Sequence, residues 1–242
     1  MRLVLSAVVL LAACATAAAD GLPDGFVRIG DVAPTIREDI RYAGSNNFAG
    51  RPLKGYEAPV CILREDAAKA LARVQAGLTK EGLTLVVYDC YRPVRAVTDI
   101  LGWSSAKEGP KNRPAFPALD RRKLVSLGYI ASKSMHSTGY AVDLGLARID
   151  QAPSAGMAAA CTAPVDKRGD QGALDFGTAY DCFDPKSWTR AAGLPPQVAA
   201  NRARLVKAMQ AEGFSNYARE WWHFTYDKHA GARAQDFLVT AK

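Results

Sequence analysis

The chain has 242 residues, of which 49% are hydrophobic and 23% are charged. This composition is typical of a globular protein that can bury a core, and it excludes an intrinsically disordered one. The formal net charge of +7 is spread along the chain and forms no basic tract of the kind that binds nucleic acids. We therefore expect no nucleic acid among the partners of this protein.

The first 19 residues have the composition of a secretory signal peptide. Arg2 precedes an apolar run over residues 3–13, which is too short to span a membrane, and a tail of small residues follows. Two processing routes remain open. Cleavage after Ala19 fits the tail, whereas the residues leading to Cys14 resemble a lipoprotein box in which this cysteine would carry a lipid anchor. Either route predicts export to the periplasm or cell envelope, without a membrane span.

Residues 20–242 are predicted to form a single domain of mixed helices and strands. Two amphipathic helices, over residues 64–82 and 197–212, have apolar side chains at helical spacing and end next to a glycine. Shorter helices are expected from Pro93 to about Trp103 and over residues 119–127. Strands are predicted at Phe26–Ile29, Leu83–Val87, Tyr140–Leu146 and Trp222–Tyr226. These elements predict an α+β fold, in which helices flank a small, mainly antiparallel sheet that carries the functional site.

The cysteines also favour an exported protein. Of the five cysteines, Cys14 belongs to the leader and four remain, which is an even number. In an oxidising compartment, four cysteines favour two disulfides over buried free thiols. Among the three pairings we favour Cys61–Cys90 with Cys161–Cys182, because the second bridge would close a glycine- and alanine-rich loop that has few other stabilising features.

Two short motifs together supply the ligands of a catalytic zinc ion. The first contains His136 and Asp143, and the second, near the C-terminus, contains Glu220 and His223. Two imidazoles and one carboxylate can hold one Zn²⁺ per chain with a position open to water. Each of these residues alone is more often structural, but two of the three histidines in the chain lie in these motifs. On a regular strand Glu220 and His223 would face opposite sides, so a bulge or tight turn is expected near Trp221.

Glu220 and Arg92 are the candidate catalytic residues. Zinc lowers the pKa of bound water to about 7, and a neighbouring carboxylate can accept the proton and return it to a departing amine. We assign this role to Glu220. A fixed guanidinium can stabilise the negative charge that develops on the carbonyl oxygen. Arg92 follows a strand and is stiffened by Pro93, although from local sequence it is equally well interpreted as a surface salt-bridge residue.

Motifs along most of the chain resemble those of the bacterial D-alanyl-D-alanine dipeptidase family. The members of this family are zinc dipeptidases. The motifs occur in the family's order over about residues 25–226. They are Arg41–Ala43, Asn47–Pro52, Gly55–Glu57, Tyr88–Pro93, Gly128–Gly139, Asp143, Phe176–Asp181 and Glu220–His223. The resemblance implies hydrolysis of the free dipeptide D-Ala-D-Ala to two D-alanines.

The resemblance also implies a role for individual residues. His136, Asp143 and His223 match the zinc ligands, Glu220 matches the general base and acid, and Arg92 matches the residue that polarises the scissile carbonyl.

The matched substrate-binding positions imply a small, closed pocket for a zwitterionic dipeptide. Asp181 matches a position that pairs with the substrate ammonium, Tyr42 a position that lines that end, and Ser134 one near the substrate carboxylate. Local sequence alone would make Tyr42 a core aromatic residue and Ser134 a turn hydroxyl.

Some features depart from the family pattern. The segment from Ala147 to Leu194 is too long for an incidental connection, and we expect it to border the active site. Within it, the part around Met157 to Gly172 is longer than in the family, which could alter the lid over the pocket. The predicted export places the enzyme where D-Ala-D-Ala is released in the envelope, which suggests salvage or wall turnover and does not imply antibiotic resistance.

Two other functions remain as alternatives, and the oligomeric state stays open. One is a D,D- or L,D-carboxypeptidase that acts on peptidoglycan stem peptides. Asp181 favours the dipeptidase over this enzyme, because an acylated substrate has no ammonium group. The other is a non-catalytic, zinc-bearing wall-binding module, against which the presence of both Glu220 and Arg92 argues.

Overall fold

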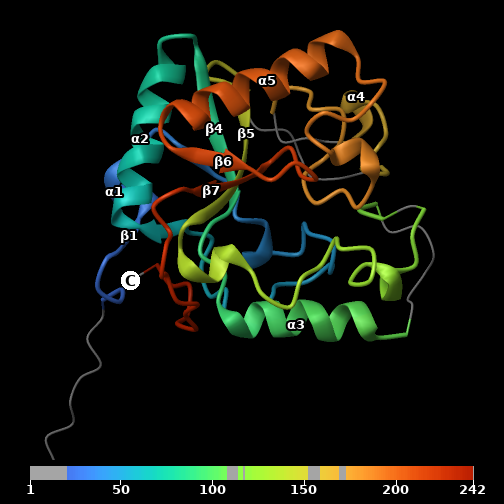
Figure 1. Cartoon of the computed structure of the whole chain (residues 1–242), viewed down its shortest axis with the longest axis horizontal. Coiled ribbons are helices and arrows are strands. Elements are labelled where there is room, and N and C mark those ends of the chain that lie inside the picture. The colour runs from blue at the N-terminus through green and yellow to red at the C-terminus, as the bar shows by residue number, and fades with distance from the viewer. Residues whose placement is uncertain (1–20, 108–113, 117, 152–158, 169–172, 242) are drawn as a thin grey trace, which may run out of the picture.

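The fold is shown in Figure 1 as a computed structural model that describes residues 21–107, 114–116, 118–151, 159–168 and 173–241. The predicted leader with Cys14 lies outside these residues, and so do parts of the long connection around Met157 to Gly172. Within the described part of the chain, none of the helices has the length and apolar character needed to cross a membrane.

A five-stranded sheet lies at the centre of the molecule, with the strand order β2-β4-β5-β7-β6. Its strands are β2 (Arg37–Glu38), β4 (Leu83–Asp89), β5 (Ala141–Arg148), β6 (Phe214–Asn216) and β7 (His223–Tyr226). Only β2 is parallel to its neighbour, and the other pairs are antiparallel. Strands β1 (Phe26–Arg28) and β3 (Ile62–Arg64) form a separate antiparallel pair. The predicted mainly antiparallel sheet is therefore confirmed.

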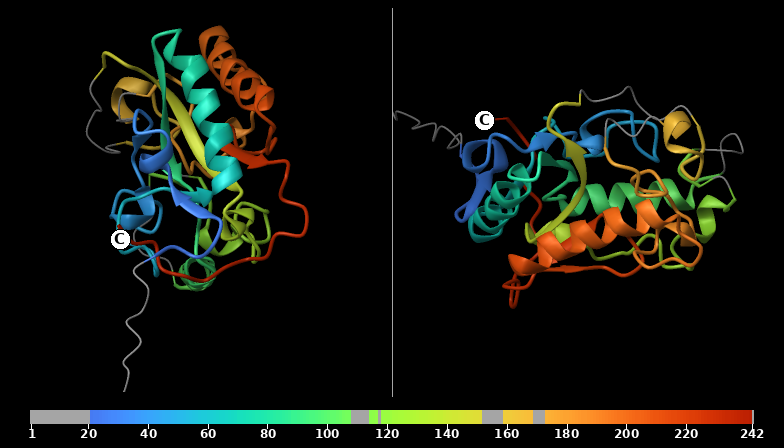
Figure 2. Two further views of the ribbon diagram at one scale, coloured as in Figure 1. Left: turned by 90° about the vertical axis from the view of Figure 1, so that its left-hand side faces the viewer. Right: turned by 90° about the horizontal axis from the view of Figure 1, so that it is seen from above.

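Helices flank this sheet, which confirms the α+β class. The two longest, α2 (Glu65–Thr79) and α5 (Pro196–Ala211), match the predicted amphipathic helices and lie side by side against the sheet (Figure 2). Helix α3 (Val94–Ser105) begins directly after Pro93 and lies apart from that pair, at the bottom of Figure 1. The remaining helices, α1 (Ile29–Val32) and α4 (Val165–Arg168), are single turns.

The prediction of a helix over residues 119–127 was wrong. This segment contains one 3-10 turn, Arg121–Lys123, followed by irregular turns that end at Gly128. Its backbone hydrogen bonds are mixed, because the amide of Leu124 donates to the carbonyl of Arg121 three residues before it, whereas the amide of Leu127 donates to the carbonyl of Lys123 four residues before it. Instead, the Arg121 side chain packs over Trp103 and donates a hydrogen bond to the carbonyl of Ala106, which fixes the turn against α3.

Both predicted disulfides are confirmed. Cys61–Cys90 joins the residue before β3 to the residue after β4, and Cys161–Cys182 joins two parts of the long connection that follows β5. All four cysteines are buried.

The register of the central strands positions the functional site. Asp143 on β5 lies directly opposite Asp89 on β4 and directly opposite His223 on β7. Facing residues of antiparallel neighbours project to the same side of a sheet. The sheet therefore brings together Asp89, Asp143 and His223, which are far apart in the sequence, in a single row across β4, β5 and β7.

Gly139 ends the 3-10 turn Met135–Thr138, which leads from His136 to β5, and it does so with a φ of +80°. A Cβ atom at this position would overlap the ring of Phe26.

We expect Gly139→Ala to destabilise the protein by about 2–4 kcal/mol, since both the left-handed conformation and the overlap oppose it. At Gly193 (φ +71°) a Cβ would meet no atom within 4 Å, so Gly193→Ala should cost only about 1–2 kcal/mol. Urea unfolding of both variants tests this, and equal losses would contradict it.

Candidate metal centre and active site

Three predicted ligand residues meet at the row of polar side chains on the sheet. The Nε2 atom of His136 lies 3.2 Å from Oδ1 of Asp143, and Nδ1 of His223 lies 2.9 Å from the same oxygen. The two ring nitrogens are 3.1 Å apart. Two imidazole nitrogens and one carboxylate oxygen therefore form a compact triangle, a donor set that can hold a metal ion.

These residues fit a divalent metal ion of the kind that imidazole and carboxylate ligands bind. Tetrahedral ligands at about 2.0–2.2 Å from a zinc ion lie roughly 3.3–3.6 Å from one another, so only a small expansion of the triangle is needed. The other ring nitrogen of His136, Nδ1, lies 2.7 Å from the carbonyl oxygen of Cys90. Donation from Nδ1 to this carbonyl leaves the Nε2 lone pair directed at the triangle, as in many metal sites.

Asp143 is held in its charged form. Burial alone would raise the pKa of this carboxyl group, but the imidazoles of His136 and His223 outweigh burial and lower the pKa below its ordinary value. The second oxygen of Asp143 accepts a hydrogen bond of 3.1 Å from the Tyr180 hydroxyl and lies 3.6 Å from the guanidinium of Arg92. A deprotonated carboxylate fixed in this way is suited to bind a cation.

Glu220 lies beside the triangle because the chain turns sharply just before β7. Its amide donates to the carbonyl of Tyr217 and its carbonyl accepts from the amide of His223, which is the predicted tight turn. Glu220 and His223 consequently face the same side, with 3.9 Å between Oε2 and Nδ1. Burial raises the pKa of Glu220 to about 7; His223 opposes this shift and Asp143 adds to it. A carboxyl group with this pKa can both accept and return a proton near neutral pH.

Arg92 is a pocket residue, which excludes the interpretation as a surface salt bridge. Its side chain is 15% exposed, and its guanidinium lies 2.7 Å from the carboxylate of Asp89 and 5.0 Å from the centre of the Tyr42 ring. Asp89 is fully buried and also accepts a hydrogen bond from the hydroxyl of Tyr56. The guanidinium is therefore fixed in orientation and faces the metal triangle.

A cavity of about 290 Å³ contains the triangle and brings together all of the predicted site residues. Its lining includes Tyr42, Arg92, Ser134, His136, Asp143, Asp181, Glu220 and His223. The cavity is at the small end of the range of about 300–1,000 Å³ that is usual for small-molecule sites. The aromatic rings of Phe48 and Phe183 also contribute to its walls. The arrangement can therefore enclose a small molecule next to the metal triangle.

Asp181 provides another buried carboxyl group in this cavity. The Tyr42 hydroxyl donates a 2.7 Å hydrogen bond to its carboxylate, so Tyr42, although buried, has a polar function as well as an aromatic one. Burial raises the pKa of Asp181 well above its ordinary value, and the charge of Asp143 raises it further. A cationic ligand group at this point would favour the charged carboxylate.

Ser134 is a turn hydroxyl, as its local sequence indicated, and it also lines the cavity. Its hydroxyl oxygen accepts a hydrogen bond of 3.3 Å from the amide of His136 and so caps the turn that carries this ligand. The same side chain is half-buried and lines the cavity.

Sequence reasoning missed two residues that hold the site together, Asp89 and Tyr180. Asp89 anchors Arg92, and Tyr180 donates to Asp143. The signal for Asp89 was its place at the end of an apolar strand, three residues before the predicted arginine. Tyr180 lies in the matched motif Phe176–Asp181, but no signal indicated its contact with Asp143, because that contact is made by a residue of a long connection.

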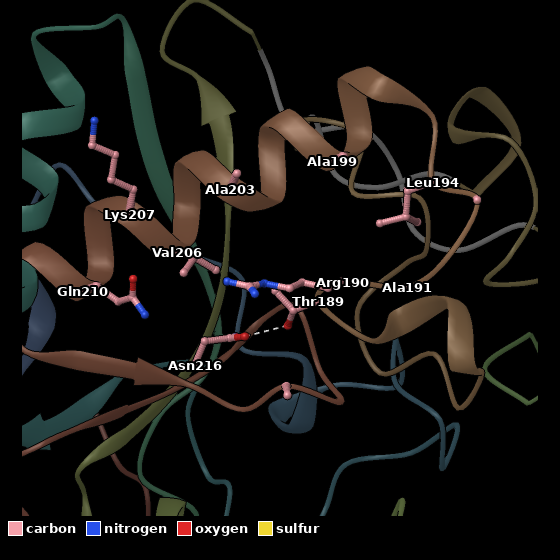
Figure 3. Close-up of a pocket in the computed structure, with 12 residues that line it drawn as sticks. Thr189, Arg190, Ala191, Leu194, Ala199, Ala203, Val206, Lys207, Gln210 and Asn216 are labelled. Carbon is pink, nitrogen blue, oxygen red and sulfur yellow. Dashed lines mark hydrogen bonds between the residues drawn. The ribbon is translucent and has the colours of Figure 1, made fainter.

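A larger cavity, of about 800 Å³, lies between α5 and the segments on either side of Thr189 and Asn216 (Figure 3). The Thr189 hydroxyl donates a 2.6 Å hydrogen bond to the side chain of Asn216 there. Among the described residues that line it there is no histidine, cysteine or carboxylate. It therefore offers no ligand set for a metal ion, and the smaller cavity is the candidate active site.

The chain matches the family described as D-ala-D-ala dipeptidase over residues 23–162 and 154–240. It is 32% identical to the D-alanyl-D-alanine dipeptidase of Enterococcus faecium, with 83% of this chain and 90% of the relative covered. The enzyme of the same name from Streptomyces coelicolor is 34% identical, with the same coverage. The one from Escherichia coli is 29% identical, over 82% of this chain and 83% of the relative.

The raised pKa of Glu220 predicts that this residue destabilises the metal-free protein at neutral pH. Because folding raises the pKa from 4.5 to about 7, stability is lost as the pH rises through this interval. In the presence of a chelator, we expect Glu220→Gln to be more stable than the wild type by about 1–3 kcal/mol at pH 8, with little difference at pH 4.5. Denaturant unfolding at both pH values measures this. Glu57→Gln, at an exposed carboxylate, is the control, and a difference for Glu220→Gln that does not vary with pH would contradict the prediction.

Proposed function

Because the chain belongs to the D-alanyl-D-alanine dipeptidase family of metallopeptidases, we propose that it is a zinc-dependent enzyme that hydrolyses free D-Ala-D-Ala to two D-alanines. One observation supports this above the others. A metal-ligand triangle, a carboxyl group with a pKa of about 7 and a second carboxylate share one small cavity. This combination suits a short substrate that carries a positive charge at one end.

In this proposal His136, Asp143 and His223 hold one Zn²⁺ per chain. When bound, zinc supplies a Lewis acid and lowers the pKa of water to about 7. The donor set and the orientation of His136 by the carbonyl of Cys90 support this assignment.

Glu220 is the proposed general base and acid. Its carboxylate accepts a proton from the attacking water and then delivers it to the nitrogen of the departing amine. Arg92 stabilises the negative charge that develops on the carbonyl oxygen, since a guanidinium already held by Asp89 needs no reorganisation during the reaction. These roles agree with the positions of both groups beside the triangle.

The polar side chains of the cavity suit the two charged ends of a dipeptide. Asp181 pairs with the substrate ammonium, and Tyr42 fixes the carboxylate for this contact through its hydroxyl. Ser134 caps the turn that carries His136 and lines the cavity, which supports a role for it in contacting the substrate carboxylate. The small cavity leaves little room beyond two methyl side chains.

We also propose that the enzyme acts in the periplasm or cell envelope. The composition of residues 1–19 supports export, and Cys14 is the candidate site of a lipid anchor. Two disulfides among the described residues are consistent with an oxidising compartment. In that location the substrate would be D-Ala-D-Ala released in the envelope, which favours salvage or wall turnover.

The test of function is the release of D-alanine from D-Ala-D-Ala by the purified mature protein, with and without a chelator, beside N-acetyl-D-Ala-D-Ala. We expect chelator-sensitive cleavage of the free dipeptide. Asp181→Asn should raise its KM by about 10–100-fold, because a charge-assisted contact to the ammonium is lost. Cleavage mainly of the acylated compound would instead indicate a carboxypeptidase. No cleavage of either compound despite bound zinc would favour the wall-binding module.

Because the metal ligands and the general base have different roles, their substitution should have different effects. Glu220→Ala should retain zinc and lose turnover by about 10²–10⁴-fold, which is the usual contribution of a general base. His223→Ala should lose the metal, since one of three ligand atoms is removed. Metal content after gel filtration and kcat for D-Ala-D-Ala distinguish the two effects. A near-native kcat for the Glu220→Ala enzyme would contradict the proposed mechanism.

A further inference from the structure

The Cys61–Cys90 disulfide is next to the proposed metal centre, because Cys90 contacts the metal ligand His136. The carbonyl of Cys90 is the group that accepts the hydrogen bond from the His136 ring, at 2.7 Å. Two residues later, the amide of Arg92 donates a 3.2 Å hydrogen bond to the carbonyl of His136. The short segment Cys90–Arg92 thus contacts both the ring and the backbone of one metal ligand.

This segment leaves the sheet at an irregular point. The pairing of β4 with β5 shifts register between Val87 and Asp89, immediately before Cys90. Beyond the shift, the disulfide links Cys90 to the start of β3, and the amide of Tyr91 donates a 2.9 Å hydrogen bond to the carbonyl of Ile62 on that strand. The bridge and this one hydrogen bond therefore attach the segment to β3.

The second disulfide adjoins another residue of the cavity, Asp181. Cys182 directly follows Asp181, whose φ of +56° is rare for a residue other than glycine. Such a conformation persists only when the surrounding structure holds it. The carbonyl of Cys161 accepts a hydrogen bond of 2.8 Å from the amide of Ala179, and the amide of Phe183 donates one of 2.9 Å to the carbonyl of Ala115. The bridge is thus part of the frame that presents Asp181 to the cavity.

We propose that the two disulfides position two different residues of the active site. Cys61–Cys90 positions the metal ligand His136 through the carbonyl of Cys90, and Cys161–Cys182 positions Asp181. The second half rests on the proposed function, because it takes Asp181 as the ammonium-binding residue. The first half concerns metal affinity and is independent of the substrate.

The chain then acquires its full metal affinity only after oxidation. Forming the Cys61–Cys90 bond converts two thiols into one sulfur–sulfur bond and releases two protons. The two electrons pass to a thiol–disulfide oxidant, whose own sulfur–sulfur bond breaks to give two thiols. An enzyme of this kind would bind metal weakly in a reducing compartment and strongly in an oxidising one.

The two bridges provide matched controls for each other. Their cysteines are separated by 29 and 21 residues, so the loss of either bridge should increase the entropy of the unfolded chain by a similar amount. We expect C61A/C90A to weaken zinc binding by about 10–100-fold, as the loss of groups that orient metal ligands does. C161A/C182A should retain zinc affinity within about 3-fold and raise the KM for D-Ala-D-Ala by about 10-fold.

Zinc affinity is measured by competition with a chelator of known affinity, and kcat, KM and Tm are measured on the same samples, well below each Tm. Equal zinc affinity in the wild type and both double variants overturns the proposal, and so does an equal loss in both. C61V/C90A restores most of the lost side-chain volume, and unchanged zinc affinity in this variant also overturns it. Failure of the wild type to cleave D-Ala-D-Ala would refute the proposed function without affecting the comparison of zinc affinities.

Discussion

The carboxylate of Asp143 is the group on which the rest of the site depends. One of its oxygens lies against the ring nitrogens of His136 and His223, and the other lies against Tyr180 and Arg92. The register of three strands places it at this junction. Because side chains alternate between the faces of a sheet, a register shift of one residue would turn the carboxylate to the opposite face. The packing of the sheet thus determines the chemistry of the site.

The presence of three acidic residues in one cavity explains both ligands that we propose for it. Asp143, Asp181 and Glu220 line the cavity, and of the cations there Arg92 is already paired with Asp89. Partly buried carboxylates without a counter-ion reduce stability, and the raised pKa of two of them reflects this cost. A metal ion and a substrate ammonium would each relieve part of it. The acidic residues proposed to bind the metal ion and the substrate therefore also lower the stability of the protein when neither is bound. Such a conflict between function and stability is common.

The sequence was sufficient to predict the three longest helices, the main strands, the disulfide pairing and which residues share the cavity, because each leaves a local pattern or part of a motif. It did not predict the short helical turns α1 and α4, and the helix expected over residues 119–127 is absent. It was also sufficient to predict the tight turn before β7, since Glu220 and His223 could not otherwise face one side. Strand β6 has only three residues and no periodicity of its own. The contact of Tyr180 with Asp143 depends on how a long connection folds back over the sheet. Such contacts arise only from tertiary packing, which periodicity does not encode.

The geometry around Asp181 also bears on the choice between a free dipeptide and a longer stem peptide. Its carboxyl group is buried and, among the residues that the structure describes, accepts a neutral hydrogen bond from Tyr42. A free dipeptide would place an ammonium against this carboxylate. An acylated stem peptide would place a neutral amide and more chain there, so the carboxylate would be desolvated further without gaining a counter-charge. When a ligand lacks the charged group that a buried carboxylate would pair with, the carboxylate stays unpaired and binding is weakened strongly. Extra apolar atoms in an apolar pocket weaken binding less. Discrimination against stem peptides would therefore come chiefly from charge, and the small size of the cavity would add to it.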